Sequence, residues 1–190
     1  MTICVLCHED LDKYPTNLEH YVHQVLIRNF GKLGIPEHFE WARRRDEQTK
    51  NGIKSVLNDI LLPIKDHKEW ATVRVHTQCN SDASVVAQDF KYIIDNLDHY
   101  EDIPAPKFKR IIKYYANLWH VDPYHISLYL YSKDECADRY AGKDSAITYA
   151  PYILSCGRIE VIAKEYSSLT EEDKIRHTIR LGTKEALEQI

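Results

Sequence analysis

The sequence lacks any apolar run long enough to cross a bilayer, for which roughly 20 residues are needed. Its first residues, MTICVLCHEDLD, show neither a basic start nor a long apolar core. We therefore expect no membrane span and no signal peptide. Positive charge is not in excess either, because the 190 residues carry a formal net charge of −4. This argues against a protein that passively coats nucleic acid.

A disulfide framework is also missing. The cysteines number five, which is odd, and two of them, Cys4 and Cys7, are separated by only two residues. This pattern favours metal binding in a reducing compartment over disulfide bonding. We expect a soluble, cytoplasmic protein of one domain or two small ones, in which an apolar fraction of 44 % suffices for a buried core.

Two pairs of zinc-binding residue types share one short spacing. Cys4 and Cys7 form the first pair, and His76 and Cys79 form the second. Two intervening residues allow a tight turn to aim both side chains at one ion, and two such pairs complete the tetrahedron of a structural zinc. The sequence therefore predicts that these four residues bind zinc and tie the amino terminus to a distant strand.

A second ligand set competes with this one. Cys4 and Cys7 followed by His20 and His23 come close to the two-cysteine, two-histidine zinc finger that reads DNA. Such fingers place three to five residues between the histidines, whereas two separate His20 from His23. Pro15 also lies near the expected start of the finger helix. The first ligand set is therefore favoured.

Residue patterns place these motifs on both helices and strands. Leu18–Val22 looks extended, and Ala71–Val75 alternates β-branched residues as a strand does. After Asn80 we expect a helix capped by Ser81 or Asp82, with its apolar side running on to Leu97.

Further elements are predicted outside the motifs. Helices are expected over residues 36–62, along the apolar side from Phe108 to Trp119, and from Thr170 towards the carboxyl end. Residues 125–132 and 146–165 read as strands. The fold class is therefore α+β.

Three motifs in this order resemble the HNH, or ββα-metal, endonuclease family in its zinc-bearing treble-clef form. They are the cysteine pair at 4–7, Glu19-His20, and His76-Thr-Gln-Cys79-Asn80. The resemblance covers roughly residues 3–98. It implies a treble-clef ββα-metal core within residues 1–100, with a helical insertion at about 36–62, followed by a small α/β region over 101–190 that binds substrate or a partner.

The resemblance also implies a role for each site residue. His20 would be the general base that activates water, while Glu19 and Asn80 would hold a catalytic Mg²⁺ or Mn²⁺. Neighbouring residues on a strand point to opposite faces, so the pair of Glu19 and His20 requires a strand end or a bulge. The zinc would be structural and fully ligated.

Three positions depart from the family pattern. His76 stands where cysteine is commoner, although imidazole also binds zinc. Glu19 replaces the more frequent aspartate, and His23 stands where many members carry proline. We interpret His23 as a surface residue, with a phosphate contact or a supporting group near the site as the alternatives.

The resulting functional hypothesis is a divalent-metal-dependent endonuclease that hydrolyses DNA, with RNA as an alternative substrate, in phage, restriction, defence or mobile-element biology. Basic stretches at 41–45 and 107–113 are interpreted first as solvated helix faces, and the tyrosine-rich second half as sheet packing; the alternative is that they contact nucleic acid, a protein partner or a second copy. One alternative is a non-catalytic zinc-dependent module that binds nucleic acid or protein. Another is a cytosolic interaction protein without metal.

Overall fold

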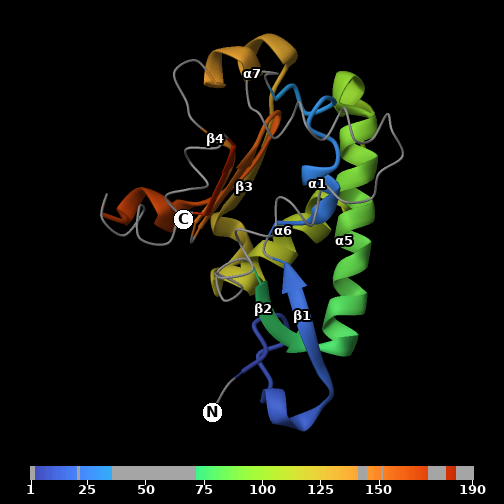
Figure 1. Cartoon of the computed structure of the whole chain (residues 1–190), viewed down its shortest axis with the longest axis vertical. Helices are drawn as coiled ribbons and strands as arrows, with labels where there is room; N and C mark the ends of the chain where they lie inside the picture. Colours follow the sequence, from blue (N-terminus) through green and yellow to red (C-terminus); the bar gives the residue numbers. More distant parts are fainter. Residues whose placement is uncertain are drawn as a thin grey trace.

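The computed structural model describes residues 3–20, 22–35, 72–140, 145–150, 152–170 and 179–182. In these ranges the chain is an α+β protein with one two-stranded and one five-stranded antiparallel sheet, which confirms the predicted fold class. Figure 1 shows the small sheet at one end of the long helix α5 and the larger sheet on the other side of α6. The helices predicted within 36–62 and the basic stretch at 41–45 lie outside the described residues.

The small sheet and the helix after it position the predicted site. Strand β1 (Thr16–His20) pairs with β2 (Thr72–His76), and His20 stands opposite Thr72 at the end of β1. Helix α5 (Thr77–Asp95) follows β2 without a connecting loop. Both predicted strands are therefore confirmed. His20 lies at a strand end, as required if the neighbouring residues Glu19 and His20 are to face one site.

Helix α5 begins earlier than the sequence indicated. Ser81 and Asp82 were expected to cap it, but the capping position belongs to His76, whose side chain makes no cap hydrogen bond. The reason is that the first helical N–H, that of Thr77, donates to the carbonyl of Pro15 at 2.8 Å. The backbone carbonyl of Pro15 thus accepts an N–H group of the first turn, for which a side-chain cap was expected.

Three helical elements pack against α5. Helix α1 (Gln24–Ile27) follows β1, η2 (Leu97–Asp102) follows α5, and α6 (Ala105–Trp119) contacts both α5 and the larger sheet. The short 3-10 turn η1 (Leu11–Lys13) precedes β1. The helix predicted from Phe108 to Trp119 is confirmed. Among the described helices, none has the length and apolar character to cross a membrane.

The larger sheet has the order β3-β6-β5-β4-β7. Its strands are β3 (Ile126–Leu130), β4 (Ser145–Ala150), β5 (Ile153–Cys156), β6 (Ile159–Ala163) and β7 (Ile179–Gly182). The 3-10 turns η3 (Pro123–His125) and η4 (Lys164–Ser168) flank β3 and β6. The two predicted strand regions are confirmed as β3 and as β4 to β6.

Two elements of this half differ from the prediction. Helix α7 (Lys133–Tyr140) was not foreseen, because only Cys136 and Tyr140 are buried along its polar sequence. Residues 179–182 form β7, whereas the sequence indicated a helix there. These residues, Ile-Arg-Leu-Gly, add a strand at the open edge of the sheet, where backbone pairing with β4 outweighs local helix propensity.

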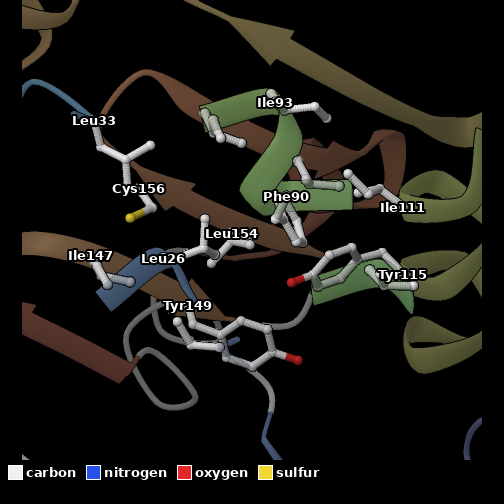
Figure 2. Packing of buried hydrophobic residues seen from close by; sticks show 14 of the residues in the cluster. Leu26, Leu33, Phe90, Ile93, Ile111, Tyr115, Ile147, Tyr149, Leu154 and Cys156 are labelled. Atoms are coloured by element: carbon white, nitrogen blue, oxygen red, sulfur yellow. The ribbon is translucent and has the colours of Figure 1, made fainter. Parts of the chain in front are cut away.

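One apolar cluster joins α1, α5, α6 and the larger sheet (Figure 2). Leu26, Phe90, Tyr115 and Leu154 are fully buried in it and come from these four elements in turn. Buried residues on both sides of residue 100 thus pack together. The division into regions 1–100 and 101–190 stays a prediction.

The turn between β5 and β6 holds Leu33, in the segment after α1, against this core. Gly157 has φ +57, and a Cβ atom there would lie 2.2 Å from the carbonyl oxygen of Leu33. The same carbonyl accepts the N–H of Arg158 at 2.9 Å. Only glycine allows so close an approach with this backbone angle.

Asp89 joins α5 to α6 from a buried position. Its side chain is 1 % exposed and accepts from Arg110 at 2.6 and 2.8 Å and from Lys107 at 3.2 Å. Burial would raise the pKa of Asp89, but the hydrogen bonds from Arg110 and Lys107 outweigh it and lower the pKa from 3.8. Part of the basic stretch at 107–113 is therefore engaged within the fold.

We expect Asp89→Asn to lower the free energy of unfolding by about 1–3 kcal/mol at neutral pH, because two cations lose a buried charged acceptor. The folded pKa is depressed, so this stabilisation is present above pH 3.8 and is lost as the pH falls through the folded pKa. Urea unfolding at several pH values measures the difference. Asp95→Asn, which removes an exposed partner of Lys32 and Lys91 from the same helix, should change stability by less than about 1 kcal/mol. Equal effects of the two variants at all pH values would contradict the assignment.

Candidate functional site

Four side chains from the amino terminus and the β2–α5 junction converge. The ligand atoms of Cys4, Cys7, His76 and Cys79 all lie within 4.8 Å of one another. In a tetrahedral zinc site with bonds of about 2.3 Å, sulfur atoms lie about 3.8 Å apart, so only small shifts are needed to enclose an ion. These four residues can therefore hold a metal ion such as zinc, as predicted. The described ranges contain no other cluster of this type, and the finger-like ligand set is not assembled.

A tight turn presents the first two ligands. The N–H of Cys4 donates to the carbonyl of Glu9 at 2.8 Å, and the N–H of His8 donates to the carbonyl of Cys4 at 2.7 Å. His8 closes the turn with φ +65, a left-handed conformation that non-glycine residues seldom adopt. Its ring stacks on that of His120 at 4.7 Å between centroids. The turn is thus held at both ends and leaves Cys7 exposed beside the buried Cys4.

His76 is oriented by its second ring nitrogen. Nε2 lies 3.0 Å from the carbonyl oxygen of Asp10, and Nδ1 lies 3.2 Å from the Sγ atom of Cys7. A carbonyl only accepts, so Nε2 carries the proton and Nδ1 keeps its lone pair towards the thiols. Metal-binding histidines are commonly fixed by such a backbone carbonyl. The ring is therefore prepared to bind an ion through Nδ1.

The crowding of thiols has an electrostatic consequence. Burial, together with the neighbouring Cys7 and Cys4, raises the pKa of Cys79 to about 12. Burial also acts against ionisation of Cys4, but backbone N–H groups of His76, Leu6 and Cys7 outweigh it and lower the pKa. Ionisation of Cys4 is thus favoured, whereas ionisation of Cys79 is opposed. A cation removes this conflict, because metal-bound thiols lose their protons.

A cleft of about 620 Å³ opens beside this centre, between β1, α1 and α5. Glu19, His20, His23 and Asn80 line it. The three residues predicted to be catalytic therefore share one cavity, although sixty positions separate His20 from Asn80 in the sequence. Their roles stay predictions.

Asn80 connects the two elements that form the cleft. Its Nδ2 atom donates to the carbonyl of Leu18 in β1 at 3.1 Å. Because Asn80 lies in the first turn of α5, this bond fixes the helix start against the strand that carries Glu19 and His20. The amide oxygen makes no hydrogen bond among the described residues.

Glu19 lies on the buried side of the cleft, with 7 % of its surface exposed. The hydroxyl of Tyr114, from α6, donates to its Oε1 atom at 3.1 Å. Burial raises the pKa of Glu19, and the hydrogen bond from Tyr114 partly offsets the rise. Burial also lowers the pKa of His20 below 6.5, so this ring is neutral at pH 7 and can accept a proton.

His23 is buried, so its interpretation as a surface residue was wrong. It occupies the N-cap position of α1 without a side-chain capping bond, and only 5 % of its surface is exposed. Its ring packs on those of Phe90 and Tyr114, with centroids 5.5 and 4.9 Å away. Burial, with a smaller contribution from His20, lowers the pKa of His23 to about 4. Its ring is also neutral at pH 7.

Comparison of the chain with models of protein families, with curated proteins and with solved structures gave no match. The likeness to HNH nucleases therefore rests on the motifs and on where their residues lie.

Sequence reasoning missed Tyr114, which supports the buried wall of the cleft, and Arg28 and Lys91, which line it. For His23, a supporting role near the site was only the alternative to a surface position. A buried tyrosine hydroxyl needs a partner, but nothing in the spacing of α6 indicates that the partner is Glu19.

We expect one zinc ion per chain in protein purified without chelator, and its loss in Cys7→Ser. Cys7 is exposed, so this change removes a ligand with little loss of packing, and a fall of several kcal/mol in stability would report the missing ion. Elemental analysis and thermal unfolding measure both effects. Cys156→Ser, at a buried cysteine outside the cluster, should retain the zinc. Wild-type protein without zinc, or an unchanged melting curve for Cys7→Ser, would contradict the assignment.

Proposed function

We propose that the protein is an HNH-type, divalent-metal-dependent endonuclease with a treble-clef ββα-metal core. The observation that carries this proposal is that Glu19, His20 and Asn80 line one cleft beside a four-residue metal centre. The order of turn, β1, β2 and α5 fits the same proposal. Within it, the four-residue centre holds a structural zinc that keeps the amino-terminal turn on the β2–α5 junction.

The donors of the cleft suit a hard cation. The carboxylate of Glu19 and the amide oxygen of Asn80 are oxygen ligands of the kind that Mg²⁺ and Mn²⁺ accept. When bound, such an ion polarises a phosphate and stabilises charge on the leaving 3′ oxygen. Two protein ligands would leave most coordination positions to water and phosphate, as Mg²⁺ prefers.

The residues of the chain divide the remaining work. His20, neutral and at the strand end, takes a proton from the attacking water. Asn80 holds β1 on α5 through the carbonyl of Leu18, so the base and the cation site keep their separation. Tyr114 limits the movement of the Glu19 carboxylate.

The substrate we propose is DNA, with RNA as the alternative. Arg28 and Lys91 line the cleft, and positive side chains there attract a phosphate backbone whatever its sequence. Arg28 is hydrogen-bonded to the neutral Gln24 at 3.0 Å, so its charge is not compensated by that contact, whereas Lys91 forms an ion pair with Asp95. No disulfide joins the described cysteines, which supports a cytoplasmic setting.

Phage, restriction, defence or mobile-element systems supply such DNA substrates. We propose that exposed tyrosines of the second half, such as Tyr124 and Tyr129, contact the substrate, a protein partner or a second copy.

A non-catalytic binding module is the second candidate. The observation that favours it is the burial of Glu19, since a carboxylate that is 7 % exposed and bonded to Tyr114 can serve the fold alone. In that case the same cleft binds phosphate through Arg28 and Lys91 without cleaving it.

We expect the wild-type protein to nick or linearise plasmid DNA with Mg²⁺ or Mn²⁺. His20→Ala should reduce the cleavage rate by about 10²–10⁴-fold, because the proton acceptor is lost. Zinc content and melting temperature should be unchanged in this variant. His125→Ala, which removes an exposed histidine paired with Glu165, should cleave like the wild type. Full activity in His20→Ala would refute the catalytic assignment, and binding without cleavage by the wild type would favour the second candidate.

A further inference from the structure

His23 is a buried polar side chain without a hydrogen bond to any described residue. Nε2 has no partner, and Nδ1 lies 3.9 Å from Oε1 of Glu19, beyond hydrogen-bond distance. Burying an unpaired polar group costs about 1–3 kcal/mol. Nε2 is enclosed by the fold, whereas Nδ1 makes no hydrogen bond among the described residues and belongs to a ring that lines the cleft, so Nδ1 is the nitrogen that a ligand in the cleft can reach.

The separation from Glu19 identifies the kind of partner. Bonds of about 2.1 Å from one metal ion to a nitrogen and to an oxygen span at most about 4.2 Å between those atoms. Nδ1 of His23 and Oε1 of Glu19, at 3.9 Å, fall within this limit. A neutral imidazole presents a lone pair, and the carboxylate beside it supplies negative charge. The two atoms are therefore close enough to share one cation.

The surrounding side chains keep this pair in place. Tyr114 donates to Glu19 at 3.1 Å and packs its ring on that of His23. Phe90 packs on the same imidazole ring. Since His23 occupies the N-cap position of α1 and Glu19 lies in β1, the rings of α5 and α6 fix both donors against the cleft.

We propose that His23 is a nitrogen ligand of the cleft cation, bound through Nδ1 together with the carboxylate of Glu19. Tyr114 is the positioning residue of that carboxylate. This inference rests on the cation site of the proposed function and assigns it an ion class: an imidazole ligand favours a transition-metal ion over Mg²⁺, and Mn²⁺ is the paramagnetic probe of that class used in the test. His20 stays unligated and free to act as the base, and Asn80 contributes its oxygen from the first turn of α5.

The test is pulsed electron paramagnetic resonance on zinc-replete protein loaded with Mn²⁺. A bound imidazole produces nitrogen hyperfine coupling at the manganese, and this signal does not depend on catalysis. We expect the coupling in the wild type and its loss in His23→Gln, with Mn²⁺ affinity lowered at least about 10–100-fold. Coupling that persists in His23→Gln, or Mn²⁺ bound in the cleft without nitrogen coupling, would overturn the proposal.

Two further variants guard against a folding defect in His23→Gln. His20→Gln removes the other cleft histidine and leaves Glu19 and His23 intact, so its coupling must persist; loss of coupling in it would assign the ligand to His20 and refute the proposal. Tyr114→Phe should weaken Mn²⁺ binding and retain the coupling, whereas unchanged affinity would refute the positioning role.

The outcome is separable from that of the proposed function. Coupling that depends on His23 in a protein that leaves plasmid intact would support the metal site and reject the nuclease. Plasmid cleavage that requires His20, in a protein whose manganese shows no nitrogen coupling, would support the nuclease and reject the ligand.

Discussion

Three thiols and an imidazole within 4.8 Å of one another form the constraint on which the described structure depends. Without a cation these groups oppose one another, since the ionisation of Cys4 makes that of Cys79 harder. With one, they join a turn that has little core of its own to the junction of β2 and α5. That junction sets where α5 starts, and the start of α5 sets where Asn80 meets β1. The cleft is thus determined by a cluster that does not line it.

The same cleft has two walls of different chemical character. On the open side, Arg28 and Lys91 offer positive charge to a polyanion. On the closed side, Glu19, His23 and Tyr114 are buried, and their pairing is decided by packing against α6. A site that combines an open, positively charged wall with a buried one can admit a phosphate backbone while packing holds its ligand atoms in place.

The zinc-type ligands could be predicted from sequence because their chemistry fixes their spacing: two residues between ligands is a property of the turn itself. The strands and the apolar sides of α5 and α6 followed from periodicity for a similarly local reason. The start of α5 could not be predicted, because the group that replaces its cap is the carbonyl of Pro15 from another segment. Nor could the burial of His23 or its contact with Tyr114, since both arise only when α1, α5 and α6 pack together. The prediction of a helix at 179–182 was wrong for the same reason, because the pairing of β7 with β4 depends on a segment outside β7 itself.

The hydrogen bond from Asn80 to Leu18 runs in one direction only, from amide to carbonyl. An aspartate has the same outline but offers oxygen where the carbonyl requires a donor, so two acceptors would face each other. Asparagine is also a residue that water slowly converts to aspartate as a protein ages. Hydrolysis of this single amide would replace the hydrogen bond between α5 and β1 by two facing acceptors at the rim of the cleft.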